Sequence, residues 1–75
     1  MYPEYRTSDL YFAAYLRTAG VSLTRTDKEG RRVFFVFCDQ GEIDDLKKQY
    51  FNRTAQVVAL NYADEVRSLK SMLFL

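Results

Sequence analysis

The residues of this chain that could carry chemistry are few. Cys38 is the only cysteine, and the sequence has no histidine to activate its thiol, so we expect a small buried apolar residue rather than a nucleophile. Four acidic side chains follow it and could be considered as Mg²⁺ ligands: Asp39, Glu42, Asp44 and Asp45. Adjacent residues diverge by about 100° around a helix, so we expect these acids to stabilise a helix start instead. The sequence therefore predicts that the protein is not an enzyme and that it has no catalytic residue, no metal site and no cofactor.

Tyrosines and arginines near the N-terminus form the first candidate binding site for a ligand or partner. The set consists of Tyr5, Arg6, Tyr11, Tyr15 and Arg17. Aromatic rings and guanidinium groups stack on nucleotide bases, and both are enriched at protein interfaces. The alternative is that the tyrosines pack at the edge of the core with their hydroxyl groups in water.

Basic residues around a predicted turn form the second candidate site, a phosphate contact. They are Arg25, Lys28, Arg31 and Arg32, and Asp27 and Glu29 lie among them. The alternative is a solvated turn whose charges protect the edge of a sheet. The net charge is only +1, which argues against a strong nucleic-acid binder.

The elements that must position these residues are predicted from periodicity and turn signals. We expect one α+β domain over residues 1–75, in the order helix, two-stranded antiparallel β-hairpin, helix, helix (αββαα). Residues 1–6 are expected to form an extended lead-in, and a helix capped by Thr7 or Ser8 is expected to end near Ala19, before Gly20.

The hairpin and the last two helices follow. The strands are expected over residues 21–26 and 31–38, around a turn at 27–30. A second helix, with Asp39 and Glu42 as a variant capping box, is expected to break at 52–54. The last helix is expected to begin between Thr54 and Ala59 and to run almost to the end of the chain.

The run Val33-Phe-Phe-Val-Phe37 has two apolar faces, and a strand of this kind needs cover on both. Three short helices cover one face easily and two faces with difficulty. We therefore expect a homo-oligomer, most simply a dimer, with an interface formed by Phe34, Val36, Phe74 and Leu75. The alternative is that Tyr2, Tyr5 and the last helix cover both faces within one chain.

Three stretches resemble a small bacterial and phage family of single-domain proteins of unknown function. They are "YRTSDLYFAAYLRTAGV", "RRVFFVF" and "ALNYADEVRSLKSML", and the most specific parts are "TSDLYFAAYL" and "YADEVRSLKSML". The resemblance covers nearly the whole chain. It implies a standalone domain and assigns no activity and no functional residue.

The expected function is that of a non-enzymatic, self-associating interaction module that binds or sequesters a macromolecule or a nucleotide-like ligand. The alternative is a weak nucleic-acid-binding regulator that uses the basic hairpin tip. The apolar runs are too short to span a bilayer, and the N-terminus has no signal-peptide hydrophobic region. We therefore expect a cytoplasmic protein with no membrane partner.

Overall fold

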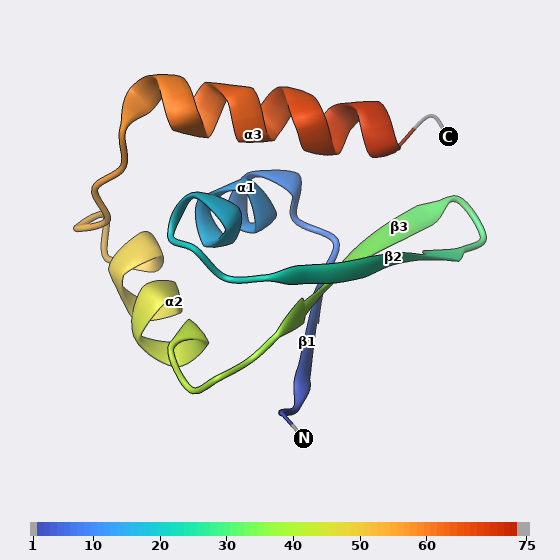
Figure 1. Ribbon diagram of the computed structural model, residues 1–75, viewed down its shortest axis with the longest axis horizontal. Helices are drawn as coiled ribbons and strands as arrows, with labels where there is room; N and C mark the ends of the chain where they lie inside the picture. The colour runs from blue at the N-terminus through green and yellow to red at the C-terminus, as the bar shows by residue number, and fades with distance from the viewer. Residues whose placement is uncertain (1, 74–75) are drawn as a thin grey trace.

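A computed structural model describes residues 2–73 of the chain. Three strands and three helices make up the fold of this part. They follow the order β1 (Glu4–Thr7), α1 (Leu10–Thr18), β2 (Leu23–Glu29), β3 (Arg32–Cys38), α2 (Ile43–Phe51) and α3 (Ala59–Met72). The strands form one antiparallel sheet in the order β1-β3-β2 (Figure 1). No helix in this described part of the chain is long and apolar enough to cross a membrane.

The predicted two-stranded hairpin and helix-first order are wrong, because the expected lead-in is a strand. Residues Glu4–Thr7 pair with β3, with Tyr5 opposite Phe37 and Thr7 opposite Phe35. This pairing makes β3 the central strand. Its backbone is bonded on both sides from Phe35 onward, so the second half of the apolar run lies in the middle of the sheet rather than at an edge.

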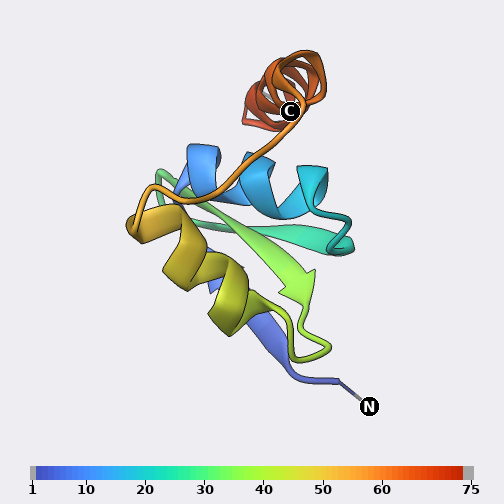
Figure 2. The same cartoon turned by 90° about the vertical axis from the view of Figure 1, so that its left-hand side faces the viewer.

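Helix α1 lies between the sheet on one side and α3 on the other (Figures 1 and 2). Five consecutive residues of α1 are buried, from Phe12 to Leu16, and Ala13 and Ala14 have no exposed surface. The small alanine side chains allow the neighbouring elements to approach the helix closely. Residues Phe35 and Phe37 of β3, Ile43 of α2 and Leu69 of α3 complete the core.

The helix ends differ from the expected ones in detail. Asp9, not Thr7 or Ser8, caps α1, because its carboxylate accepts the N–H groups of Tyr11 at 3.0 Å and Phe12 at 3.1 Å. Helix α2 begins after Glu42, which makes no side-chain cap. Asp39 instead accepts the N–H of Gly41 at 2.9 Å. Gly41 has a φ of 101°, which is not helical, so the predicted capping box between Asp39 and Glu42 does not form.

The hairpin turn is shorter than predicted. Glu29 pairs with Arg32, so Gly30 and Arg31 alone form the loop. Gly30 has a φ of 62°, which favours glycine at this position. The strand β2 therefore continues through Asp27 and Lys28, which were expected in the turn, and it has a bulge between Leu23 and Arg25.

Candidate functional site

The candidate tyrosine and arginine site is not a single surface. Tyr15 is 4% exposed, and Tyr5 is half-buried with its ring 6.1 Å from that of Phe12, so both pack in the core. Tyr11 is exposed on α1, where its carbonyl accepts the hydroxyl of Tyr62 at 3.1 Å. The structure therefore divides this set between the core, the exposed side of α1 and the sheet face opposite the helices.

The two arginines of that set are both occupied by acidic partners. The Nε of Arg17 lies 2.8 Å from Oε2 of Glu65 on α3. Arg6 lies on the sheet face opposite the helices, where its Nη2 is 2.8 Å from Oε1 of Glu29 and its Nε is 4.0 Å from Oδ2 of Asp27.

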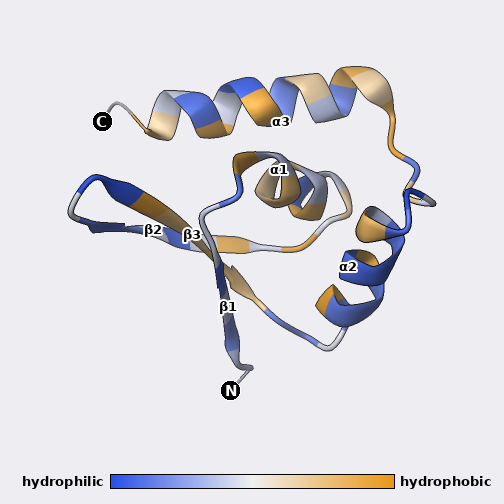
Figure 3. Ribbon diagram, turned by 180° about the vertical axis from the view of Figure 1, so that it is seen from behind, coloured by the Kyte–Doolittle hydropathy of each residue, from blue (hydrophilic) through white to orange (hydrophobic). Residues whose placement is uncertain are grey.

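The same face explains how the second side of β3 is covered. Its apolar row of Phe34, Val36 and Cys38 lies between charged side chains of β1 and β2. The guanidinium of Arg6 lies 4.3 Å above the ring of Phe34, and Val36 has no exposed surface. Figure 3 shows the apolar β3 beside the more hydrophilic β1.

The expected oligomer interface therefore has a different setting in the folded chain. Val36 is already buried by the chain's own side chains, and Phe34 is half-buried under Arg6. Phe74 and Leu75 lie outside the described residues. The ion pairs between β1 and β2 lie across the apolar row of β3 and cover it within one chain, whereas a second protomer was expected to cover it.

Arg25 belongs to this ion-pair network rather than to a free basic patch. Its guanidinium bonds to both carboxylate oxygens of Glu4 on β1, and its Nε lies 3.0 Å from Oδ1 of Asp27. The hydrogen bond between Arg25 and Glu4 lowers the pKa of the Glu4 carboxyl. The hydrogen bonds of Arg25 to Glu4 and to Asp27 raise the pKa of its guanidinium. Lys28, Arg31 and Arg32 have no ion-pair partner among residues 2–73.

The Glu4–Arg25 pair gives a testable pH dependence. Because the folded-state pKa of Glu4 lies below its unfolded value, the pair stabilises the fold above that unfolded value, and the contribution is lost as the pH falls through the folded-state pKa. We expect an NMR titration of the Glu4 carboxyl to give a low pKa, and Arg25→Met to return it to the ordinary value. Arg67→Met, which removes a pair with Asp64 on α3, should leave it unchanged.

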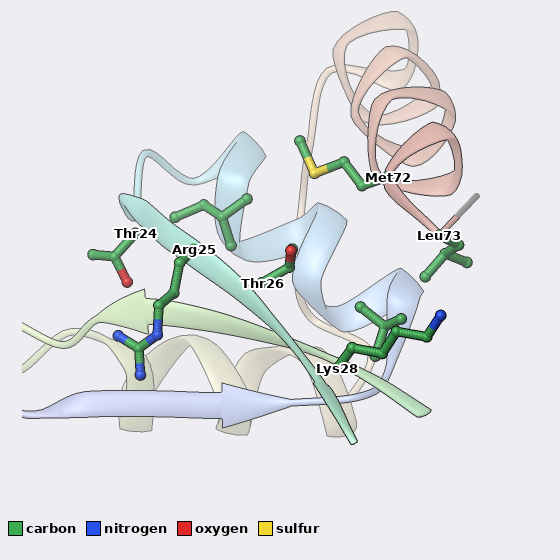
Figure 4. Close-up of a pocket in the computed structure, with 8 residues that line it drawn as sticks. Thr24, Arg25, Thr26, Lys28, Met72 and Leu73 are labelled. Carbon is green, nitrogen blue, oxygen red and sulfur yellow. The ribbon is translucent and has the colours of Figure 1, made fainter. Parts of the chain in front are cut away.

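A groove of about 410 Å³ lies between β2 and the end of α3 (Figure 4). Apolar side chains from Leu23, Val33, Met72 and Leu73 line it together with Thr24, Arg25, Thr26 and Lys28. Helix α3 packs on α1, and its C-terminal turn extends over the hairpin. The groove is the space beneath that turn, at the open side of β2.

The outer edge of β2, on the side away from β3, has no neighbouring strand along this groove within the described part of the chain. The N–H of Cys38 donates to Ser22 at 3.0 Å, and the N–H of Asp39 donates to Pro3 at 2.9 Å, so even-numbered residues of β3 bond toward β2 and odd-numbered ones toward β1. Thr26 and Lys28 lie opposite the odd-numbered Phe35 and Val33. Their N–H and C=O groups therefore point away from the sheet, toward the free edge.

A second hollow continues the groove toward the start of β2. It shares Leu23 and Met72 with the groove, and Arg17, Gly20, Val21, Ser22 and Glu65 complete its lining. Its two charged residues are paired with each other, as described above. A ligand at this end meets a neutralised ion pair, whereas a ligand near the hairpin tip meets the unpaired Lys28.

Apart from Arg25 and Lys28, which belong to the predicted phosphate contact, the residues of the groove were not predicted as a site. The groove forms only because α3 extends far enough for Met72 and Leu73 to lie beside the hairpin. No local sequence pattern predicts how far a helix extends over a distant strand. The available signal was indirect: a strand that is paired on one side only must have a free edge. The acidic residues after Cys38 are not gathered either, since the described residues contain no group of three His, Cys, Asp or Glu that could hold a metal ion.

Comparison with known proteins gives a family but no function. A family model described as a domain of unknown function (DUF5659) matches residues 3–75. This match includes every strand and helix of the structure. No curated protein and no solved structure matches the chain.

Proposed function

Because this chain belongs to the DUF5659 family, whose function is unknown, its role must be argued from its surface, and we propose that it is a non-enzymatic interaction module. The binding surface is the free edge of β2 together with the groove beneath the end of α3. The bound group is an extended protein segment that adds to the sheet as a fourth strand.

One observation carries this proposal. The outward N–H and C=O groups of Thr26 and Lys28 lie beside a groove with an apolar lining. Strand addition needs both features, because backbone hydrogen bonds supply affinity and side-chain pockets supply specificity. The other edge, β1, has only four residues, and none of them lines the groove.

Catalysis has no part in the proposal. The sequence has no histidine, and Cys38 is half-buried at the end of β3, on the sheet face away from the groove. Lys28 is the only residue of the groove that carries both a titratable proton and no ion-pair partner among residues 2–73. A single lysine beside apolar side chains is suited to binding rather than to acid–base chemistry.

The backbone donor of Thr26 provides the test. We expect Thr26→Pro to abolish the binding of extended peptides, because proline has no N–H to offer at the free edge. The fold should survive, since this N–H makes no bond within the sheet. Thr26→Val keeps the donor and should bind as the natural protein does. Binding by fluorescence anisotropy and folding by circular dichroism are measured for both variants. Equal binding by Thr26→Pro and Thr26→Val would contradict strand addition.

Nucleic-acid binding at the hairpin tip is the second candidate function. The absence of ion-pair partners for Lys28, Arg31 and Arg32 within residues 2–73 favours it, because unpaired cations can contact phosphates. The mixed signs around the tip weaken it, since Asp27 and Glu29 lie among these cations.

Self-association as a homodimer also remains a prediction. The burial of Val36 removes one of the four expected contacts, Phe34 is half-buried, and Phe74 and Leu75 lie outside the described residues. A cytoplasmic location and an origin in bacteria or phages are further parts of the proposal, and they rest on the sequence alone.

A further inference from the structure

The two ends of the groove differ in charge, and this difference indicates the charge of the partner. Lys28 lines the groove and, like Arg31 in the adjoining loop, has no ion-pair partner among residues 2–73. The nearby acidic residues, Asp27 and Glu29, lie on the opposite face of the sheet and pair with Arg6 and Arg25. The groove therefore has a cationic end at the hairpin tip and an apolar middle.

The apolar middle lies where the side chains of an added strand would point. Residues directly opposite each other in antiparallel strands point to the same face of the sheet. Thr26 and Lys28 point toward the side on which Met72 and Leu73 close the groove (Figure 4). A side chain opposite Thr26 would be placed beneath these two apolar residues, and a side chain near the tip would be placed beside Lys28.

A second copy of this chain fits the edge poorly. If two β2 strands paired about Thr26, Lys28 would face Thr24 of the other copy, which carries no negative charge. If they paired about Asp27, the two Asp27 carboxylates would lie directly opposite each other, which is destabilising. Neither register gives the cationic end an acidic partner.

We infer that the partner is an extended segment of another protein with alternating apolar residues and a carboxylate placed to meet Lys28. This inference rests on the proposed strand addition at β2. The apolar side chains enter the groove beneath Met72 and Leu73, and the acidic residue lies at the hairpin-tip end. The neutralised Arg17–Glu65 pair at the other end sets no charge requirement there.

A library of random twelve-residue peptides displayed on phage tests both the strand addition at β2 and the acidic character of the partner. Selection on the natural protein, after depletion on Thr26→Pro, should enrich peptides in which Asp or Glu adjoins alternating apolar residues. One enriched peptide, synthesised and labelled, should bind about three- to tenfold more weakly to Lys28→Glu. Lys28→Arg keeps the positive charge and should retain more of this binding than Lys28→Glu. Lys48→Glu makes the same charge change on α2, away from the groove, and should bind the peptide as the natural protein does.

The other outcomes separate the two proposals. Enriched peptides without acidic residues, or equal binding by Lys28→Glu, would refute the acidic partner and leave strand addition standing. No enrichment over the Thr26→Pro variant would refute strand addition itself. A protein that sediments as a dimer, and as a monomer after Thr26→Pro, would show that a second copy occupies the edge. Displacement of the peptide by single-stranded oligothymidylate would assign the site to nucleic acid.

Discussion

Replacing Leu69 with alanine is expected to remove a large part of the stability of the fold. Leu69 is the only residue of α3 that is fully buried, and it joins α3 to the core around α1. Truncation of a buried leucine costs about 2–5 kcal/mol, whereas a chain of this length is stable by roughly 4–11 kcal/mol. Urea denaturation followed by circular dichroism measures the change in the free energy of unfolding.

The same helix provides the control. Leu60 is the second residue of α3 and is 76% exposed, so Leu60→Ala makes the same chemical change without removing a core contact. We expect it to change the free energy of unfolding by less than about 0.5 kcal/mol. Similar effects of the two substitutions would mean that α3 is not docked through Leu69.

Replacing Tyr5 with proline is expected to have a comparable effect, because it disrupts β1. Tyr5 lies opposite Phe37, a position at which β1 and β3 exchange backbone hydrogen bonds. Proline removes the donor and leaves a buried acceptor unpaired, and the aromatic contact with Phe12 is lost as well. We estimate a loss on the order of 3–5 kcal/mol, measured by urea denaturation.

Tyr2→Pro is the matched control for this substitution. Tyr2 is 60% exposed and precedes β1, so its ring and its backbone contribute little to the core. Its replacement should leave the denaturation midpoint nearly unchanged. If Tyr5→Pro were equally harmless, residues Glu4–Thr7 would not be a structural strand.

The elements with strong local signals could be predicted from the sequence. The end of α1 before Gly20, the presence of the hairpin with Gly30 in its turn, and a last helix that begins between Thr54 and Ala59 all follow from local residue preferences. The strand β1 could not be predicted in this way. It has four residues, and it forms because β3 offers a second edge to pair with, which is a property of distant sequence.

The candidate site depended on the same missing strand. Arg25 and Lys28 are three residues apart and look equivalent in the sequence, but only Arg25 reaches Glu4 on β1. Without β1, the face with Phe34 and Val36 had to be predicted as bare, and a second protomer was the simplest cover. The groove beneath Met72 and Leu73 likewise depends on a contact between segments far apart in the chain.

The central position of β3 also has a consequence for aggregation. Its Val33–Phe37 run combines high β-propensity with no charge and no proline, which is the composition of segments that form amyloid fibrils. In the folded chain β2 pairs along the whole run, and β1 pairs with its second half from Phe35 onward, so this second half is bonded on both edges and a neighbouring molecule cannot extend it. Arg31 and Arg32 before it and Asp39 after it act as gatekeepers when the chain is unfolded. The short strand β1 therefore protects the second half of this aggregation-prone segment from fibril growth.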